Sequence, residues 1–180
     1  GYHADNRIRR ESSSGGVCKT LIIDSLKNGM VDGAYSLKCT DSFPFAQGEF
    51  YTREHIPSFG DMPNSVYHSV MACTEIDRIQ PCKRLMLVGT ACQLRALNSI
   101  IKDKCDEVVR VCIFCKQQKT LDSTRFLAKM MGTSVPPNLK FRPRYRGDGW
   151  PGIVRVDGFE LPYSRAAQIP FGKRLWTVPG

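Results

Sequence analysis

Arg84-Leu85-Met86-Leu87-Val88 is a compact apolar run that ends at the turn Gly89-Thr90. This pattern predicts a strand followed by a sharp turn. Residues 91–101 then carry apolar side chains at helical spacing, and residues 107–114 form a second apolar run. Strand, helix and strand in this order predict two parallel strands joined by a right-handed crossover.

Working outward from this unit, residues 17–27 have apolar side chains at helical spacing, and Gly29 can end a helix there. The serines at 12–14 are typical helix caps, which predicts that they begin this helix. In the first half, the patterns also predict a strand over 30–37, loops around a short strand over 42–64, and a short helix over 70–78. In the second half, they predict a helix over 120–131 and a hairpin over 152–161 that turns at Asp157-Gly158.

Together these elements predict an α/β fold with a mixed, partly parallel sheet, flanking helices and a loop-rich, basic C-terminal segment. The 180 residues have the size of a single domain, 1–180. Hydrophobic residues make up 42% and charged residues 24%, which excludes a disordered chain and a coiled coil. No apolar run has the ~20 residues of a membrane span, and the first residues have no secretory pattern. We therefore expect a cytoplasmic protein without membrane contact.

The net charge is +9, with 26 Lys and Arg against 17 Asp and Glu. Such a balance favours anionic partners, which include nucleic acids and phosphate-bearing cofactors. Charge that only keeps the protein in solution is the alternative.

The cysteines are numerous for a chain with no export signal, eight in all. Cys92 and Cys115 each follow one of the two predicted parallel strands, so both are expected at the carboxyl edge of the sheet, where open α/β sheets bind ligands. Thiolates there could bind an iron–sulfur cluster or another metal, or do redox work, or they could be ordinary core residues. Cys112 and Cys115 have CxxC spacing, but no second pair completes a zinc site. The other cysteines are interpreted as small core side chains: Cys18, Cys39, Cys73, Cys82 and Cys105.

Two further segments could bind anions. The turn Ser12-Ser13-Ser14-Gly15-Gly16 opens a helix, where hydroxyls and free N–H groups can cradle a phosphate, although an ordinary capped helix is the alternative. Residues 141–150 interleave basic and aromatic side chains, a pattern that suits RNA, single-stranded DNA or a flavin dinucleotide, as well as a solvated loop.

In their order along the chain, four motifs resemble the coenzyme F420 hydrogenase/dehydrogenase beta-subunit family. They are Arg-Arg-x-Ser-Ser-Ser-Gly-Gly, Val88-Gly89-Thr90-Ala91-Cys92-Gln93, Phe114-Cys115, and the segment from Phe141-Arg142 to Gly149-Trp150. The resemblance implies an iron–sulfur flavoprotein with FAD and a [4Fe–4S] cluster. It implies electron transfer between the cluster, FAD and an organic acceptor or donor such as the deazaflavin F420.

The resemblance also implies roles for individual residues. Cys92 and Cys115 would be cluster ligands. The residues implied at the flavin are Ser13, Ser14, Gly15, Gly16, Thr90, Arg142, Arg144 and Trp150. No catalytic residue is implied.

The sequence departs from the family pattern in three places. Ala91 replaces the usual Pro, and Lys116-Gln117 follows Cys115 where the family often has His-Gly. A further CxxC usual in the family is missing after residue 150, so we expect a piece of a longer protein in which other cluster ligands lie elsewhere. A redox partner or ferredoxin-like domain and an anionic small substrate are the expected partners. The alternative function is a basic α/β module that binds nucleic acid, with structural cysteines.

Overall fold

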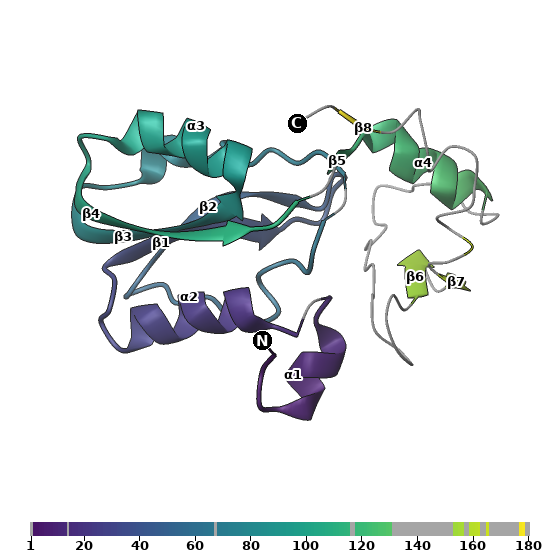
Figure 1. Ribbon diagram of the computed structural model, residues 1–180, viewed down its shortest axis with the longest axis horizontal. Coiled ribbons are helices and arrows are strands. Elements are labelled where there is room, and N and C mark those ends of the chain that lie inside the picture. The colour runs from purple at the N-terminus through teal and green to yellow at the C-terminus, as the bar shows by residue number, and fades with distance from the viewer. Residues whose placement is uncertain are drawn as a thin grey trace.

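A four-stranded sheet forms the centre of the fold, in the order β2-β1-β3-β4 (Figure 1). The computed structural model describes residues 2–13, 15–66, 68–115, 118–130, 153–156, 159–162, 165 and 177–178. β1 (Gly33–Cys39) pairs antiparallel with β2 (Ala46–Thr52), and parallel with β3 (Cys82–Thr90). β3 is parallel to β4 (Cys105–Ile113). The predicted mixed, partly parallel sheet is therefore confirmed.

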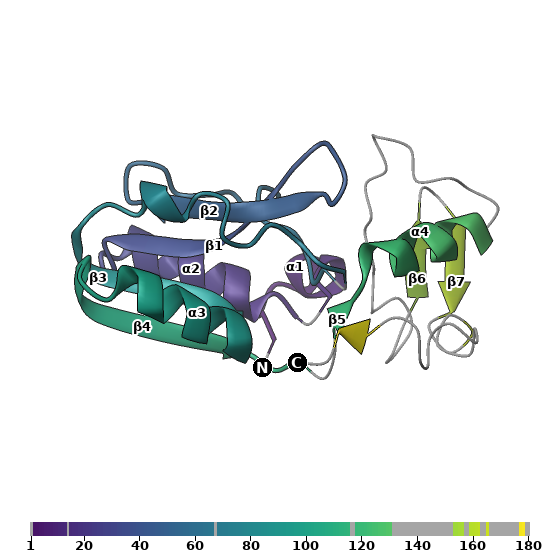
Figure 2. The same cartoon turned by 90° about the horizontal axis from the view of Figure 1, so that it is seen from above.

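Two helices cover opposite faces of this sheet, α2 (Val17–Lys27) on one and α3 (Ala91–Ile101) on the other (Figures 1 and 2). Side chains on β3 alternate between the faces because successive strand residues point to opposite sides. Met86 and Val88 join the apolar cluster of α2, whereas Leu85 and Leu87 join that of α3. The four buried residues explain why this part of the sequence is continuously apolar.

The predicted crossover from β3 through α3 to β4 is confirmed. The boundaries of α3 agree with the prediction, and local hydrogen bonds fix its first end. At the first end, the backbone N–H of Thr90 donates to Gln93 Oε1 over 2.9 Å, and the Thr90 hydroxyl donates to the same oxygen over 3.0 Å. These bonds help to define the first turn of α3.

Two predictions near the N-terminus are wrong. The serines do not cap α2, because its N-cap is Gly16, which makes no side-chain cap hydrogen bond. Instead Ser12 closes a helix that was not predicted, α1 (Asn6–Glu11), where its N–H donates to the Ile8 carbonyl oxygen over 3.1 Å. β1 also begins later than predicted, because the backbone N–H groups of Met30 and Val31 both donate to Ser25 at the end of α2.

The predicted helix over residues 70–78 is likewise wrong. Only its end is helical, as the short 3-10 helix η1 (Ile76–Arg78). Met71 forms a parallel bridge with Gln47 on β2, and the carbonyl of Ala72 accepts from the Tyr35 hydroxyl over 2.8 Å. These contacts to the sheet replace the hydrogen bonds that a helix would make.

The remaining elements lie beyond the end of the sheet at which the chain leaves β4 (Figures 1 and 2). They are α4 (Leu121–Met130), the antiparallel pair β6 (Ile153–Val156) and β7 (Phe159–Pro162), and the short pair β5 (Gln118–Lys119) and β8 (Thr177–Val178). The predicted helix and the strands of the predicted hairpin are confirmed. The turn at Asp157-Gly158 and most of the basic C-terminal segment lie outside the described residues.

A buried histidine connects α4 to the first half of the chain. His68 Nε2 lies 2.9 Å from the Pro44 carbonyl oxygen, and Nδ1 lies 3.0 Å from the Thr124 hydroxyl on α4. Because a carbonyl only accepts, Nε2 carries the proton and Nδ1 accepts from the hydroxyl. Burial lowers the pKa of His68, which keeps the ring neutral in this arrangement. The described residues contain no helix long and apolar enough to cross a membrane.

Candidate functional site

The carboxyl edge of the sheet contains a cavity of about 480 Å³. Its volume lies within the ~300–1,000 Å³ usual for small-molecule sites. It lies between the beginning of α2, the ends of β3 and β4, and the segment 62–66. Three separate motifs from the sequence reach it, through Ser12, Ser13, Gly16, Thr90, Gln93 and Cys115.

The beginning of α2 forms one wall of this cavity. Gly15 and Gly16 have φ values of +83° and +81°. Glycine adopts this backbone conformation readily because it has no Cβ, whereas other residues disfavour it. This pair turns the chain sharply, so that α2 starts at the cavity with Val17, Cys18 and Lys19 in its wall. The first N–H groups of a helix have no partner within it, and they carry the positive end of the helix dipole. This wall is therefore suited to an anionic group.

The serines before the glycines support the wall. Ser13 Oγ accepts from the backbone N–H of Ser65 over 3.2 Å, which connects this turn to segment 62–66. The ammonium group of Lys19 donates to the carbonyl oxygens of Phe59 and Met62, at 3.1 and 2.5 Å, so it holds the same loop in place. Of the predicted flavin residues in this turn, Ser13 and Gly16 line the cavity. Gly15 is buried beside them, and Ser14 lies outside the described residues.

The end of β3 forms the second wall. Thr90 and Gln93 both line the cavity and bond to each other at the start of α3. Gly89 lets the Gln93 side chain lie close to the end of β3, because a Cβ at position 89 would be only 3.2 Å from Gln93 Oε1. Cys92 Sγ lies 3.2 Å from the Thr90 hydroxyl oxygen, on an exposed part of the same turn. The Gly-Thr-x-Cys-Gln motif thus places its threonine and glutamine at the cavity and its cysteine in the first turn of the helix.

The end of β4 completes the edge. Thr90 and Ile113 are register partners in the parallel pair, so Cys92 and Cys115 each follow a paired residue by two positions. Both thiols are exposed, and Cys115 lines the cavity together with the fully exposed ring of Phe114. The structure places the two cysteines at the same sheet edge, as the parallel topology predicts. Arg142, Arg144 and Trp150 lie outside the described residues.

Sequence reasoning missed three cavity residues with ionisable side chains: Lys19, which holds the neighbouring loop, and Cys18 and Tyr35, which carry a thiol and a phenol. Burial raises the pKa of the Cys18 thiol above its usual value, and burial raises the pKa of Tyr35 to about 12. Both groups are therefore neutral at neutral pH. None of the described residues that line the cavity is acidic, so these walls do not repel an anion. The one usable signal in the sequence was that Cys18 lies two residues after the glycine pair.

The interpretation of five cysteines as core residues is correct only in part. Cys39 and Cys73 are exposed, because one ends β1 and the other lies in the turn before η1. Cys18, Cys82 and Cys105 are half-buried and pack against the two apolar clusters.

Comparison with known proteins bears on this site. Residues 1–55, which contain the Ser-Ser-Ser-Gly-Gly turn, match the N-terminal region of the coenzyme F420 hydrogenase/dehydrogenase beta subunit. The predicted resemblance to this family is confirmed. Among curated proteins no match is found.

A solved structure is similar over nearly the whole chain. It belongs to the F420-reducing [NiFe] hydrogenase complex from Methanosarcina barkeri, with a TM-score of 0.66 and 16% sequence identity. The match covers 99% of this chain and 62% of that chain. At this identity the similarity shows a shared fold.

Proposed function

We propose that this chain is the flavin-binding core of an iron–sulfur oxidoreductase, which exchanges electrons with an organic acceptor or donor such as a deazaflavin of the F420 type. One observation carries the proposal: the glycine turn, the Gly-Thr-x-Cys-Gln motif and Cys115 meet at one cavity. The match of residues 1–55 to the F420 hydrogenase/dehydrogenase beta subunit supports it. A protein partner is consistent with the multi-subunit complex to which the similar chain belongs.

The residues at the cavity fit FAD in chemical terms. The N–H groups at the beginning of α2 would hold the pyrophosphate, as helix N-termini do in other nucleotide sites. Thr90 and Ser13 offer hydroxyl groups, and the partly exposed side chains of Leu37, Val66 and Ile113 offer apolar surface for a ring system. When bound, FAD supplies the coupling of one-electron and two-electron transfer.

The chain's own residues supply binding and orientation. The glycine turn and the Lys19 contacts fix the wall that faces an anion, and the hydrogen bonds of Thr90 with Gln93 fix the opposite wall. Preformed walls of this kind lower the entropic cost of binding.

Cys92 and Cys115 would contribute two ligands of the cluster. A [4Fe–4S] cluster is normally held by four thiolates. Within the described residues, no group of three or more His, Cys, Asp or Glu side chains could hold a metal ion. The described part of the chain therefore does not fit a complete cluster site, and the remaining ligands would come from other residues or from a redox partner.

A titration with FAD tests the binding proposal, with fluorescence quenching as the readout. We expect Thr90→Val to weaken FAD binding about threefold to tenfold, the loss of one hydrogen bond worth ~0.5–1.5 kcal/mol. Thr90→Ser keeps the hydroxyl and should bind nearly as the wild type does. Thr74→Val removes an exposed hydroxyl away from the cavity and is the matched control. Equal affinity of all four proteins would contradict the role of Thr90.

Iron analysis tests the cluster assignment separately. In protein prepared without oxygen, Cys92→Ser and Cys115→Ser should each lower the bound iron, while Cys73→Ser should not. Wild-type iron content in either of the first two variants would refute that residue's assignment as a ligand.

A further inference from the structure

A second pair of cysteines lies at the opposite, amino edge of the sheet. Cys82 begins β3 and Cys105 begins β4, and the two are register partners in the parallel pair. Their sulfur atoms are 3.2 Å apart, and both side chains are half-buried against the apolar cluster of α3. The proposed function does not use this pair.

We propose that Cys82 and Cys105 are an oxidative modification site, at which a low-molecular-weight disulfide converts the two thiols into a cross-strand disulfide. The bond would link the beginnings of β3 and β4 and enclose the whole crossover unit.

Register pairing in a parallel sheet is compatible with the backbone geometry of such a bond. Neighbouring strands lie ~4.8 Å apart, which falls within the ~4.4–6.8 Å that disulfides require between Cα atoms. The sulfur atoms need to approach by about 1 Å to reach the bond length of ~2.05 Å. Strand pairing therefore does not have to change.

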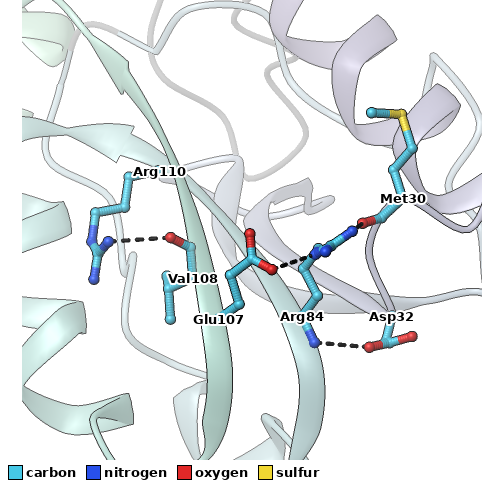
Figure 3. Close-up of polar contacts among 6 residues, drawn as sticks. All are labelled: Met30, Asp32, Arg84, Glu107, Val108 and Arg110. Carbon is cyan, nitrogen blue, oxygen red and sulfur yellow. Dashed lines mark hydrogen bonds and ion pairs between the residues drawn. The ribbon is translucent and has the colours of Figure 1, made fainter.

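A neighbouring ion pair also joins the two strands at this edge. Arg84 and Glu107 are register partners two positions farther along the same strands, and Arg84 Nε lies 2.8 Å from Glu107 Oε2 (Figure 3). Arg84 also donates to the Met30 carbonyl oxygen over 3.0 Å, and its backbone N–H donates to Asp32 over 2.8 Å (Figure 3). The ion pair links β3 to β4 two positions from the thiols, and the other two contacts tie the beginning of β3 to the segment before β1.

A metal is the less suitable occupant. Two thiolates that share one zinc ion, each at ~2.3 Å, stand farther apart than these sulfur atoms. The described residues also add no third ligand to the pair. A bond between the two sulfur atoms suits the geometry better.

The reaction balances with glutathione disulfide as the oxidant. One cysteine thiolate attacks a sulfur atom of glutathione disulfide, which releases one glutathione thiolate and leaves a mixed disulfide. The second cysteine thiolate then attacks the protein sulfur, which releases the second glutathione and forms the bond between Cys82 and Cys105. Two electrons pass from the pair to glutathione, and the two cysteine protons end on the released thiols.

The pH dependence of this step follows from the surroundings of Cys82. Burial raises the pKa of Cys82 to about 12, and the nearby Cys105, Asp32 and Asp106 add to the increase. Because the thiolate is the nucleophile, bond formation should be slow at neutral pH and faster at alkaline pH.

The test is incubation of the intact chain with glutathione disulfide, followed by alkylation of the remaining thiols, digestion and mass spectrometry. We expect a cross-linked peptide pair containing Cys82 and Cys105, formed faster at pH 9 than at pH 7. The oxidised chain should melt at a higher temperature, by roughly 5–10 °C, because the link constrains the unfolded chain.

Two variants control the experiment. Cys105→Ala should abolish the cross-link and the rise in melting temperature, whereas Cys73→Ser, at an exposed cysteine, should leave both unchanged. Recovery of Cys82 and Cys105 in the wild type as separate alkylated or glutathionylated residues would overturn the proposal. This outcome requires no variant to fold, and it has no bearing on FAD binding at the other edge.

Discussion

The substitution Gly16→Ala adds one carbon atom at the beginning of α2 and tests how this wall of the cavity is built. The φ of Gly16, +81°, is costly for any other residue, by ~1–2 kcal/mol. A Cβ there would lie 2.9 Å from Ile8 Cγ2, 3.0 Å from Ser12 Oγ and 3.1 Å from Phe59 Cζ. Alanine also restricts the unfolded chain, which offsets ~0.4–1 kcal/mol of the cost. The close contacts of the new Cβ add to the cost of the substitution, since overpacking typically costs ~1–3 kcal/mol. We therefore expect Gly16→Ala to lower the free energy of unfolding by about 1–4.5 kcal/mol.

Urea denaturation followed by circular dichroism measures this change. In a chain of this size the same change corresponds to a fall of about 2–18 °C in melting temperature. FAD affinity, measured where both proteins are folded, should fall as well, because Gly16 itself and one displaced side chain, that of Ser12, line the cavity. Gly60→Ala is the matched control, since its Cβ would meet only Ser58 Oγ, at 3.8 Å. If Gly16→Ala and Gly60→Ala had the same midpoint and the same FAD affinity, the reasoning about this wall would be refuted.

Two further predictions concern the sheet. Burial raises the pKa of Tyr35 to about 12, so the neutral phenol is favoured in the folded state. The contribution of the neutral phenol to the free energy of unfolding is complete below pH 10 and is lost as the pH rises towards 12. Tyr35→Phe should therefore reduce the loss of stability between pH 10 and 12. At neutral pH it should cost ~0.5–1.5 kcal/mol, because the Ala72 carbonyl loses its hydrogen-bond donor. A variant with the same alkaline stability profile as the wild type would count against this prediction. Arg84→Gln removes the exposed ion pair with Glu107 and should cost ~0.2–1 kcal/mol at low salt and less at high salt. The exposed neighbour Lys83→Gln serves as control, and a cost for Arg84→Gln that does not depend on salt would argue against an electrostatic origin.

Sequence reasoning succeeded where local patterns carry the information. The unit from β3 to β4 was predicted well because an apolar run, a capped helix and a second run follow each other without interruption. The position of Cys92 and Cys115 at one edge followed from parallel pairing alone. Helix α1 was missed because Asn6–Glu11 contains a single apolar side chain, Ile8, so no periodicity reveals it.

Other features depend on contacts between distant segments, which a sequence pattern does not contain. Ser13 resembles a helix cap, and only the fold shows that it bonds to Ser65 instead. The cavity forms because segment 62–66 returns to the beginning of α2, held there by Lys19. The cysteine pair of Cys82 and Cys105 became visible only with the strand register, because the two residues are far apart in the chain.

Whether the chain binds FAD is the most direct test of the account. We would titrate the protein, prepared without oxygen, with FAD, and measure the flavin and iron retained after gel filtration. We expect saturable binding of one FAD per chain, weakened by Gly16→Ala. A chain that retains no FAD, yet binds oligonucleotides with a steep dependence on salt, would contradict the account and favour the nucleic-acid alternative.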